Sequence, residues 1–170
     1  DVFAVPFAQI GPILERSPAA AKQLASRARG RLRGAGPARP ADHARQRHLL
    51  DAFLAAARDG DFDGLLAVLD PDVVLRADAG NGPLGPSQIV RGASAVAGQA
   101  LRFAPVARHA RPVMVNGAPG LIAVPNRQPI AVMGVTVRAD RIAEIEILAD
   151  PERLRELDPT AWTDPDPTAA

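Results

Sequence analysis

The chain has 170 residues, with 20 basic and 19 acidic side chains, and it contains no cysteine. This length can hold one medium-sized domain beside a smaller helical piece, and the lack of cysteine excludes disulfides, thiolate metal sites and a cysteine nucleophile. With no apolar run of about 18 residues and no signal-peptide pattern, we expect a cytoplasmic protein without a membrane partner. Residues 1–34 carry six basic and two acidic residues, whereas the remainder carries 14 and 17. Only the front piece is therefore an electrostatic candidate for nucleic acid.

Residues 1–34 predict two helices joined by a short turn. The first ends near Glu15, and its apolar face is formed by Val5, Phe7, Ile10, Ile13 and Leu14. Ser17 is a suitable N-cap for the second helix, and Pro18 suits its first position. An apolar stripe then follows three-and-four spacing at Ala21, Leu24, Ala28 and Leu32. The opposite face carries Lys22, Gln23, Ser26, Arg29 and Arg33, with Arg27 at its edge.

Two helices at a tight turn, with a basic second helix, are typical of a helix-turn-helix whose second member recognises DNA. The absence of acidic residues from 17 to 34 favours a polyanion, because a solvated helix gains from mixed charges. The spacing alone leaves a second interpretation open, an ordinary helical hairpin with an arginine-rich exposed side.

The segment DVFAVPFAQIGPILERSPAAAKQLASRARGRLRG resembles the end of region 4 of an extracytoplasmic-function sigma factor. The similarity lies in an Ile-Gly pair, then Arg-Ser-Pro-Ala-Ala-Ala, then Gln-Leu-Ala-Ser-Arg-Ala-Arg. It implies that this helix reads the −35 promoter element and that the region docks on core RNA polymerase. By position, Ser17, Lys22, Gln23, Ser26 and Arg27 would face DNA, with Arg29 and Arg33 on phosphates. Because the sequence opens inside that region, we expect a fragment or a shortened relative, with region 2 of the same protein as a further partner.

The rest of the chain predicts a mixed domain behind a linker. Residues 35–41 (AGPARPA) form the linker, because three of the seven are Pro or Gly. An amphipathic helix over 42–60 is predicted by the shared face of Leu49, Leu50, Phe53, Leu54 and Ala57. Asp61 is expected to cap a short helix that ends at Leu69. The elements expected after it are a strand over 73–77, a Gly/Pro loop over 79–87, a helix over 93–103, extended stretches over 107–115, 120–125, 129–138 and 141–148, a tight hairpin at 139–140, a helix over 151–157 capped by Asp150, and a tail over 158–170. This order indicates an α+β fold.

The order resembles the SnoaL-like branch of the NTF2-like cone folds, in which a bent antiparallel sheet wraps around helices, with the domain spanning 42–157. A subset of extracytoplasmic-function sigma factors carries such an extension after region 4. That subset has a Gly-rich acidic loop after the first strand and an Asn/Asp-Pro-Asp/Glu-Lys/Arg-Leu motif after the last. Here the second motif is Asp150-Pro151-Glu152-Arg153-Leu154, and the segment NGAPG at 116–120 is similar too.

The first loop departs from that pattern. Residues 78–82 (DAGNG) lack the consecutive glycines and the basic residue of the subset. The resemblance nonetheless implies regulatory contacts with the DNA-binding parts from two segments: Asp78, Gly80 and Gly82, and Asp150, Pro151, Glu152, Arg153 and Leu154.

Some cone-fold proteins are isomerases or hydrolases that use a His–Asp pair or an Asp base. The candidates here are His109, Asp72, Asp78, Arg76 and Arg111, and such chemistry needs them inside a pocket. We expect His109 on an exposed strand face, beside other polar residues. His43 and His48 are five apart, off the i,i+4 spacing of metal pairs. We therefore expect no enzyme activity, no catalytic residue, no metal and no cofactor.

The residues expected inside the cone are apolar: Leu121, Ala123, Ile130, Val132, Met133, Val135 and Val137. They form either a plain core or, by fold analogy, a pocket for a small apolar effector. We expect a sigma factor with a built-in regulator. Two alternatives stay open, a free-standing cone-fold enzyme with a helical arm and a one-component repressor with a ligand-sensing cone.

Overall fold

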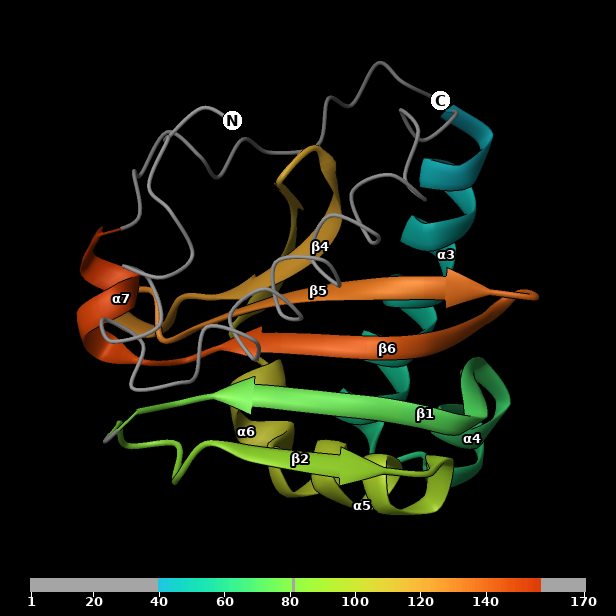
Figure 1. The fold of residues 1–170 in the computed structure, drawn as a ribbon, viewed down its shortest axis with the longest axis horizontal. Helices are drawn as coiled ribbons and strands as arrows, with labels where there is room; N and C mark the ends of the chain where they lie inside the picture. The colour runs from blue at the N-terminus through green and yellow to red at the C-terminus, as the bar shows by residue number, and fades with distance from the viewer. Residues whose placement is uncertain (1–39, 81, 157–170) are drawn as a thin grey trace, which may run out of the picture. The chain divides into compact units, whose positions relative to one another are not determined.

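The computed structural model describes residues 40–80 and 82–156 (Figure 1). The chain divides into two units between Ala38 and Arg39, and all described residues belong to the second. The predicted helix-turn-helix, with its candidate DNA-binding residues, and the predicted tail lie outside the described residues. So does most of the predicted linker.

The described unit combines a single sheet with helices. Its elements are α3 (Pro40–Asp59), α4 (Phe62–Val68), β1 (Leu69–Asp78), β2 (Gln88–Arg91), α5 (Ala93–Arg102), α6 (Ala104–Ala107), β3 (Ala110–Val115), β4 (Ala118–Ala123), the 3-10 turn η1 (Pro125–Arg127), β5 (Ala131–Arg138), β6 (Arg141–Leu148) and α7 (Pro151–Glu156). The six strands lie in the order β2-β1-β6-β5-β4-β3. Neighbouring strands are antiparallel except β1 and β6, which run parallel. The α+β prediction is confirmed.

Helix α3 is the long helix that the apolar stripe predicts. All five predicted stripe residues are buried. Leu49, Phe53 and Ala57 join the main core, while Leu50 and Leu54 pack with Leu121. In Figure 1 α3, α5 and α6 lie behind the sheet, so one face of the sheet packs on helices.

The first strand is longer than predicted and contains Pro71. The pairing of β1 with β6 shifts between Leu69 and Val74, so Pro71 falls where the ladder is interrupted. Proline has no N–H to donate and is tolerated at such irregularities. Helix α4 before it begins at the predicted cap, because the Asp61 carboxylate accepts a hydrogen bond from the Gly64 N–H at 2.8 Å.

The short elements α6 and β2 were not predicted, and neither was the 3-10 turn η1. Residues 104–107 form α6, with a proline in its first turn, so the predicted strand over 107–115 is wrong at its start and β3 begins at Ala110. Strand β2 is a four-residue edge strand paired with β1. Stretches this short carry too little periodicity to be recognised from sequence.

The hairpin between β5 and β6 is confirmed. Ala139 and Asp140 have φ values of 46° and 62°, which is the conformation of a two-residue type I′ turn. Val137 pairs with Ile142 and Thr136 with Glu144, so Ala143 is an extra residue on β6. This bulge places Ile142 and Ile145 on the same buried face despite their odd spacing.

The sheet buries apolar residues on both faces. One face packs on α3 and α5 in the main core. On the other, Val113, Ile122 and Val132 pack with Leu154 of α7. Val132 and Met133 are consecutive and so point to opposite faces; the prediction that both line one interior is therefore wrong for Val132.

Candidate functional site

The two predicted regulatory segments meet because β1 and β6 are parallel neighbours that end at the same edge of the sheet. Asp78, the last residue of β1, pairs with Leu148, the last residue of β6. The Asp78 carbonyl oxygen accepts hydrogen bonds from the N–H groups of Ala149 at 2.7 Å and Asp150 at 3.1 Å. The pairing thus places the start of one segment against the start of the other.

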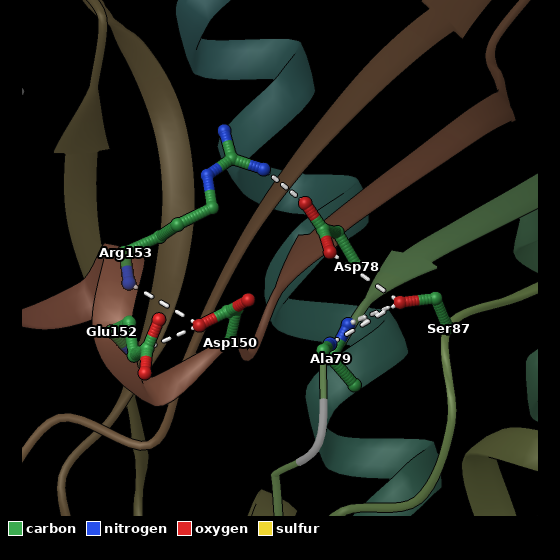
Figure 2. Close-up of polar contacts among 7 residues, drawn as sticks. Asp78, Ala79, Ser87, Asp150, Glu152 and Arg153 are labelled. Carbon is green, nitrogen blue, oxygen red and sulfur yellow. Dashed lines mark hydrogen bonds and ion pairs between the residues drawn. The ribbon is translucent and has the colours of Figure 1, made fainter. Parts of the chain in front are cut away.

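Asp150 caps α7, as predicted. Its Oδ1 accepts hydrogen bonds from the N–H groups of Glu152 at 2.8 Å and Arg153 at 3.3 Å (Figure 2). Pro151 occupies the first helical position, where its missing N–H costs nothing. The cap therefore fixes the direction in which α7 leaves the sheet.

Asp78 links α7 to the loop that follows β1. One carboxylate oxygen forms an ion pair with the Arg153 guanidinium, and the other accepts a hydrogen bond from Ser87 Oγ at 3.4 Å (Figure 2). Ser87 Oγ in turn accepts from the N–H groups of Ala79 at 3.0 Å and Gly80 at 3.2 Å. Ser87 was not among the predicted residues; a hydroxyl at the far end of a Gly/Pro loop was the signal available.

Gly80 and Gly82 of this loop are required by close approaches of other atoms, including atoms of the second segment. Gly80 has φ +51°, and a Cβ there would collide with the Asp150 carboxylate. A Cβ on Gly82 would lie 2.8 Å from the Ala79 carbonyl oxygen and 3.0 Å from Pro151 Cδ. We call residues 78–80, 82–87 and 149–154 together the interlocked site.

Leu154 anchors the interlocked site to the sheet. It is buried against Val113, Ile122 and Val132 on the outer face. By contrast, the side chains of Asp78 and Arg153 are 45% and 59% exposed. Exposed ion pairs contribute little to stability, so the apolar contact of Leu154 and the Asp150 cap hold α7 more than the ion pair does.

A groove of about 520 Å³ runs beside the interlocked site. Asp78 and Arg153 line it together with Asn116, which belongs to the segment at 116–120 that resembles the same subset of sigma factors. The pairing of β4 with β5 stops at Gly120 and Gly134. Beyond that point Gln46 Nε2 donates to the carbonyl oxygens of Pro119 and Val135, each at 3.1 Å. The groove therefore lies where the β3–β4 hairpin separates from β5.

The candidate acid–base residues do not gather in the interior. His109 is exposed and lies in the turn before β3, so its predicted place in a strand is wrong, while its predicted exposure is confirmed. Asp72 and Arg111 are exposed, and Asp78 pairs with Arg153. In residues 40–80 and 82–156, no group of three or more His, Cys, Asp or Glu side chains could hold a metal ion. Nor, in the same ranges, is any helix long and apolar enough to cross a membrane.

The described unit is an α+β domain with a curved, unclosed six-stranded sheet, helices on one face and α7 on the other, as expected for the predicted cone fold. The chain is homologous to extracytoplasmic-function sigma factors. It is 32% identical over 161 residues to the probable ECF RNA polymerase sigma factor SigI of Mycobacterium tuberculosis, covering 92% of this chain and 53% of SigI. It is also 32% identical over 170 residues to the ECF RNA polymerase sigma factor SigJ of the same species, covering 90% and 53%.

The crystal structure of Mycobacterium tuberculosis SigJ is similar as well, with 30% sequence identity and a TM-score of 0.54. The match covers 90% of this chain and 56% of SigJ. The chain thus spans about half the length of the curated relatives it matches. No family model matches it.

Proposed function

We propose that this chain is part of an extracytoplasmic-function sigma factor whose cone domain regulates promoter recognition. The homology to SigI and SigJ runs over at least 90% of the chain and so extends into the segment before the cone. The observation that carries the regulatory part is the interlocked site, where parallel pairing of β1 and β6 joins both predicted segments beside one groove. The partners are promoter DNA, core RNA polymerase and region 2 of the same protein, in the cytoplasm.

The DNA-binding role is proposed for the helix after Pro18. Lys22 and the neighbouring Arg residues give residues 1–34 an excess of four positive charges, from six basic and two acidic side chains. Gln23 and Arg27 can read base edges, while Arg29 and Arg33 neutralise phosphates. These contacts would bring the polymerase to the −35 element.

The regulatory role is proposed for the exposed part of the interlocked site. Asp78 and Arg153 keep much of their surface accessible and line the groove, where a partner segment can compete for their charges. The short predicted linker keeps the two parts of the chain at a millimolar effective concentration. A weak contact between the cone and the DNA-binding parts would then be populated.

Regulation is favoured over catalysis by the positions of the candidate acid–base groups. Asp78 is tied to Arg153 at the edge of the sheet, and His109 faces solvent. A general acid or base must instead lie within hydrogen-bond reach of a sequestered substrate.

The test is transcription by the full-length protein with core RNA polymerase on a pool of genomic promoter fragments. A deletion from Asp150 onward, and separately Asp78→Asn with Arg153→Gln, should change promoter-specific transcription at least several-fold. Arg155→Gln, which alters an exposed arginine of the same helix, is the matched control. Unaltered transcription in both test variants would remove the regulatory role. Tight binding to a palindrome without polymerase would instead support a one-component repressor.

A further inference from the structure

A basic stretch lies in the middle of the cone sequence. Residues 79–139 carry six arginines and no acidic side chain, so all 17 acidic residues of 35–170 lie on either side of this stretch. On a surface that is only solvated, charges of both signs would be interspersed. The uneven distribution therefore indicates a basic face on a domain that is otherwise acidic.

The fold places exposed arginines at the turn that connects α6 with β3. Arg58 of α3 donates hydrogen bonds to the carbonyl oxygens at the two ends of this turn, from Nε to Ala107 at 3.0 Å and from a terminal nitrogen to Ala110. Arg108 lies within the turn, and its side chain is exposed. Arg58 thus holds the turn in place and adds a second guanidinium near Arg108.

A third arginine reaches the same turn from the end of β4. The Val124 N–H donates to the His109 carbonyl oxygen at 3.0 Å, so the pairing of β3 with β4 continues into the turn. The 3-10 turn η1 follows directly and carries Arg127, which is exposed. We call Arg58, Arg108 and Arg127 the arginine cluster.

The positive charges of the arginine cluster are not neutralised by carboxylates of the described residues. Arg58 donates to neutral carbonyl oxygens, and within residues 40–80 and 82–156 neither Arg108 nor Arg127 forms an ion pair. Asp59 follows Arg58 in the chain, and even with it the cluster carries more positive than negative charge. None of the three arginines lines the groove beside the interlocked site. The cluster is therefore a separate, positively charged surface.

We propose that the arginine cluster is a docking surface for a short acidic segment of another protein, whose Asp or Glu carboxylates bind the guanidiniums. The planar guanidinium fork matches a carboxylate with two parallel hydrogen bonds. A long polyanion such as DNA would also meet the acidic remainder of the cone, whereas a short segment ends within the cluster. At physiological salt, charges more than about 8 Å apart are largely screened, so the local excess of arginine decides the binding of a short segment. This inference does not rest on the proposed function.

The experiment uses a fluorescent peptide of alternating Glu and Gly, titrated into the full 170-residue chain and followed by anisotropy. The same peptide with Gln in place of Glu is the uncharged comparison and should not bind. Arg108→Gln combined with Arg127→Gln should weaken binding of the Glu peptide about five-fold, because two exposed ion pairs are lost. In NMR spectra of the unaltered chain, the amide signals of both arginines should shift as the Glu peptide is added.

A charge-matched pair of substitutions separates local contacts from net charge. Arg91→Gln combined with Arg155→Gln removes the same charge from exposed positions elsewhere on the cone, and it should weaken the Glu peptide less than about two-fold. Equal losses in the two double variants, or no binding of the Glu peptide at millimolar concentration, overturn the docking surface. A short DNA duplex is titrated in parallel. If the cluster variant weakens the duplex more than the Glu peptide, the surface is for nucleic acid and the proposal is wrong.

Discussion

At the scale of single residues, Asp150 has two structural roles. Its Oδ1 caps α7, while its Oδ2 lies where a side chain on Gly80 would have to be. The resemblance predicted both residues as contacts for another part of the protein. Their observed contacts are with each other's segments, so a partner would have to act on a site that is already assembled.

Removing the cap should destabilise α7. Asp150→Ala deletes two hydrogen bonds to N–H groups and is expected to cost about 1 kcal/mol of unfolding free energy. Urea denaturation gives the global change, and amide exchange at Leu154 reports the local one. Glu152→Ala, at an exposed acidic position in the same motif, should change neither by more than about 0.5 kcal/mol. Equal effects of the two variants would contradict the assignment of the cap.

Two glycine variants separate the free-energy cost of backbone strain from the cost of a steric collision. Gly80→Ala forces alanine into a positive φ and also drives a Cβ into the Asp150 carboxylate, so we expect a loss of about 2 kcal/mol or more. Gly85→Ala is the matched control, because Gly85 also has a positive φ (+96°) but a Cβ added there would meet no atom within 4 Å. It should cost about 1 kcal/mol. In an Asp150→Ala background the difference between the two glycine variants should shrink.

At the scale of elements, the stability of the interlocked site depends on how tightly α7 docks on the sheet. This helix has six residues, too few to be stable in isolation. Leu154, buried on the outer face of the sheet, is its apolar anchor. We therefore regard α7 as a helix that can leave the sheet without unfolding the main core, which lies on the opposite face.

Leu154→Ala tests this separation. The variant should lose about 2 kcal/mol of docking free energy, and amide exchange should rise at Arg153–Glu156 while Ile145 in the main core stays protected. Arg155→Ala, on the exposed side of α7, should leave both regions unchanged. A uniform rise across the sheet would show that α7 is part of the global unfolding unit instead.

At the scale of the whole molecule, charge is divided between the two parts of the chain. The front piece is basic, whereas residues 35–170 carry 14 basic and 17 acidic residues. A phosphate-binding surface on the front piece would make promoter affinity fall with salt. The cone would contribute little to that dependence.

The salt dependence of promoter binding, measured with core polymerase, is the corresponding test. Arg29→Ala should reduce the slope of log affinity against log salt by about 1, because one phosphate contact is lost. Arg91→Ala, at an exposed position on the edge strand β2, is the control and should leave the slope unchanged. If Arg91→Ala reduced the slope and Arg29→Ala did not, the DNA contacts would lie on the cone.

Local patterns were enough to predict several elements. The apolar stripe of α3, the Asp61 and Asp150 caps and the turn at Ala139–Asp140 depend on residues close together in the chain, so the sequence by itself determined them. The order of the predicted elements indicated an α+β fold, and the resemblance added the cone. Sequence did not reveal α6 and β2, because each is only four residues long.

Only the tertiary structure decided which distant residues meet. Asp78 and Asp150 are brought together by the parallel pairing of β1 and β6, which depends on the packing of the whole sheet. Ser87 acquired its role in the same way, because the fold closes its loop onto Asp78. These contacts have no periodic signature in the sequence, because contacts across a sheet are set by strand order and register. Local propensity acts over only a few residues.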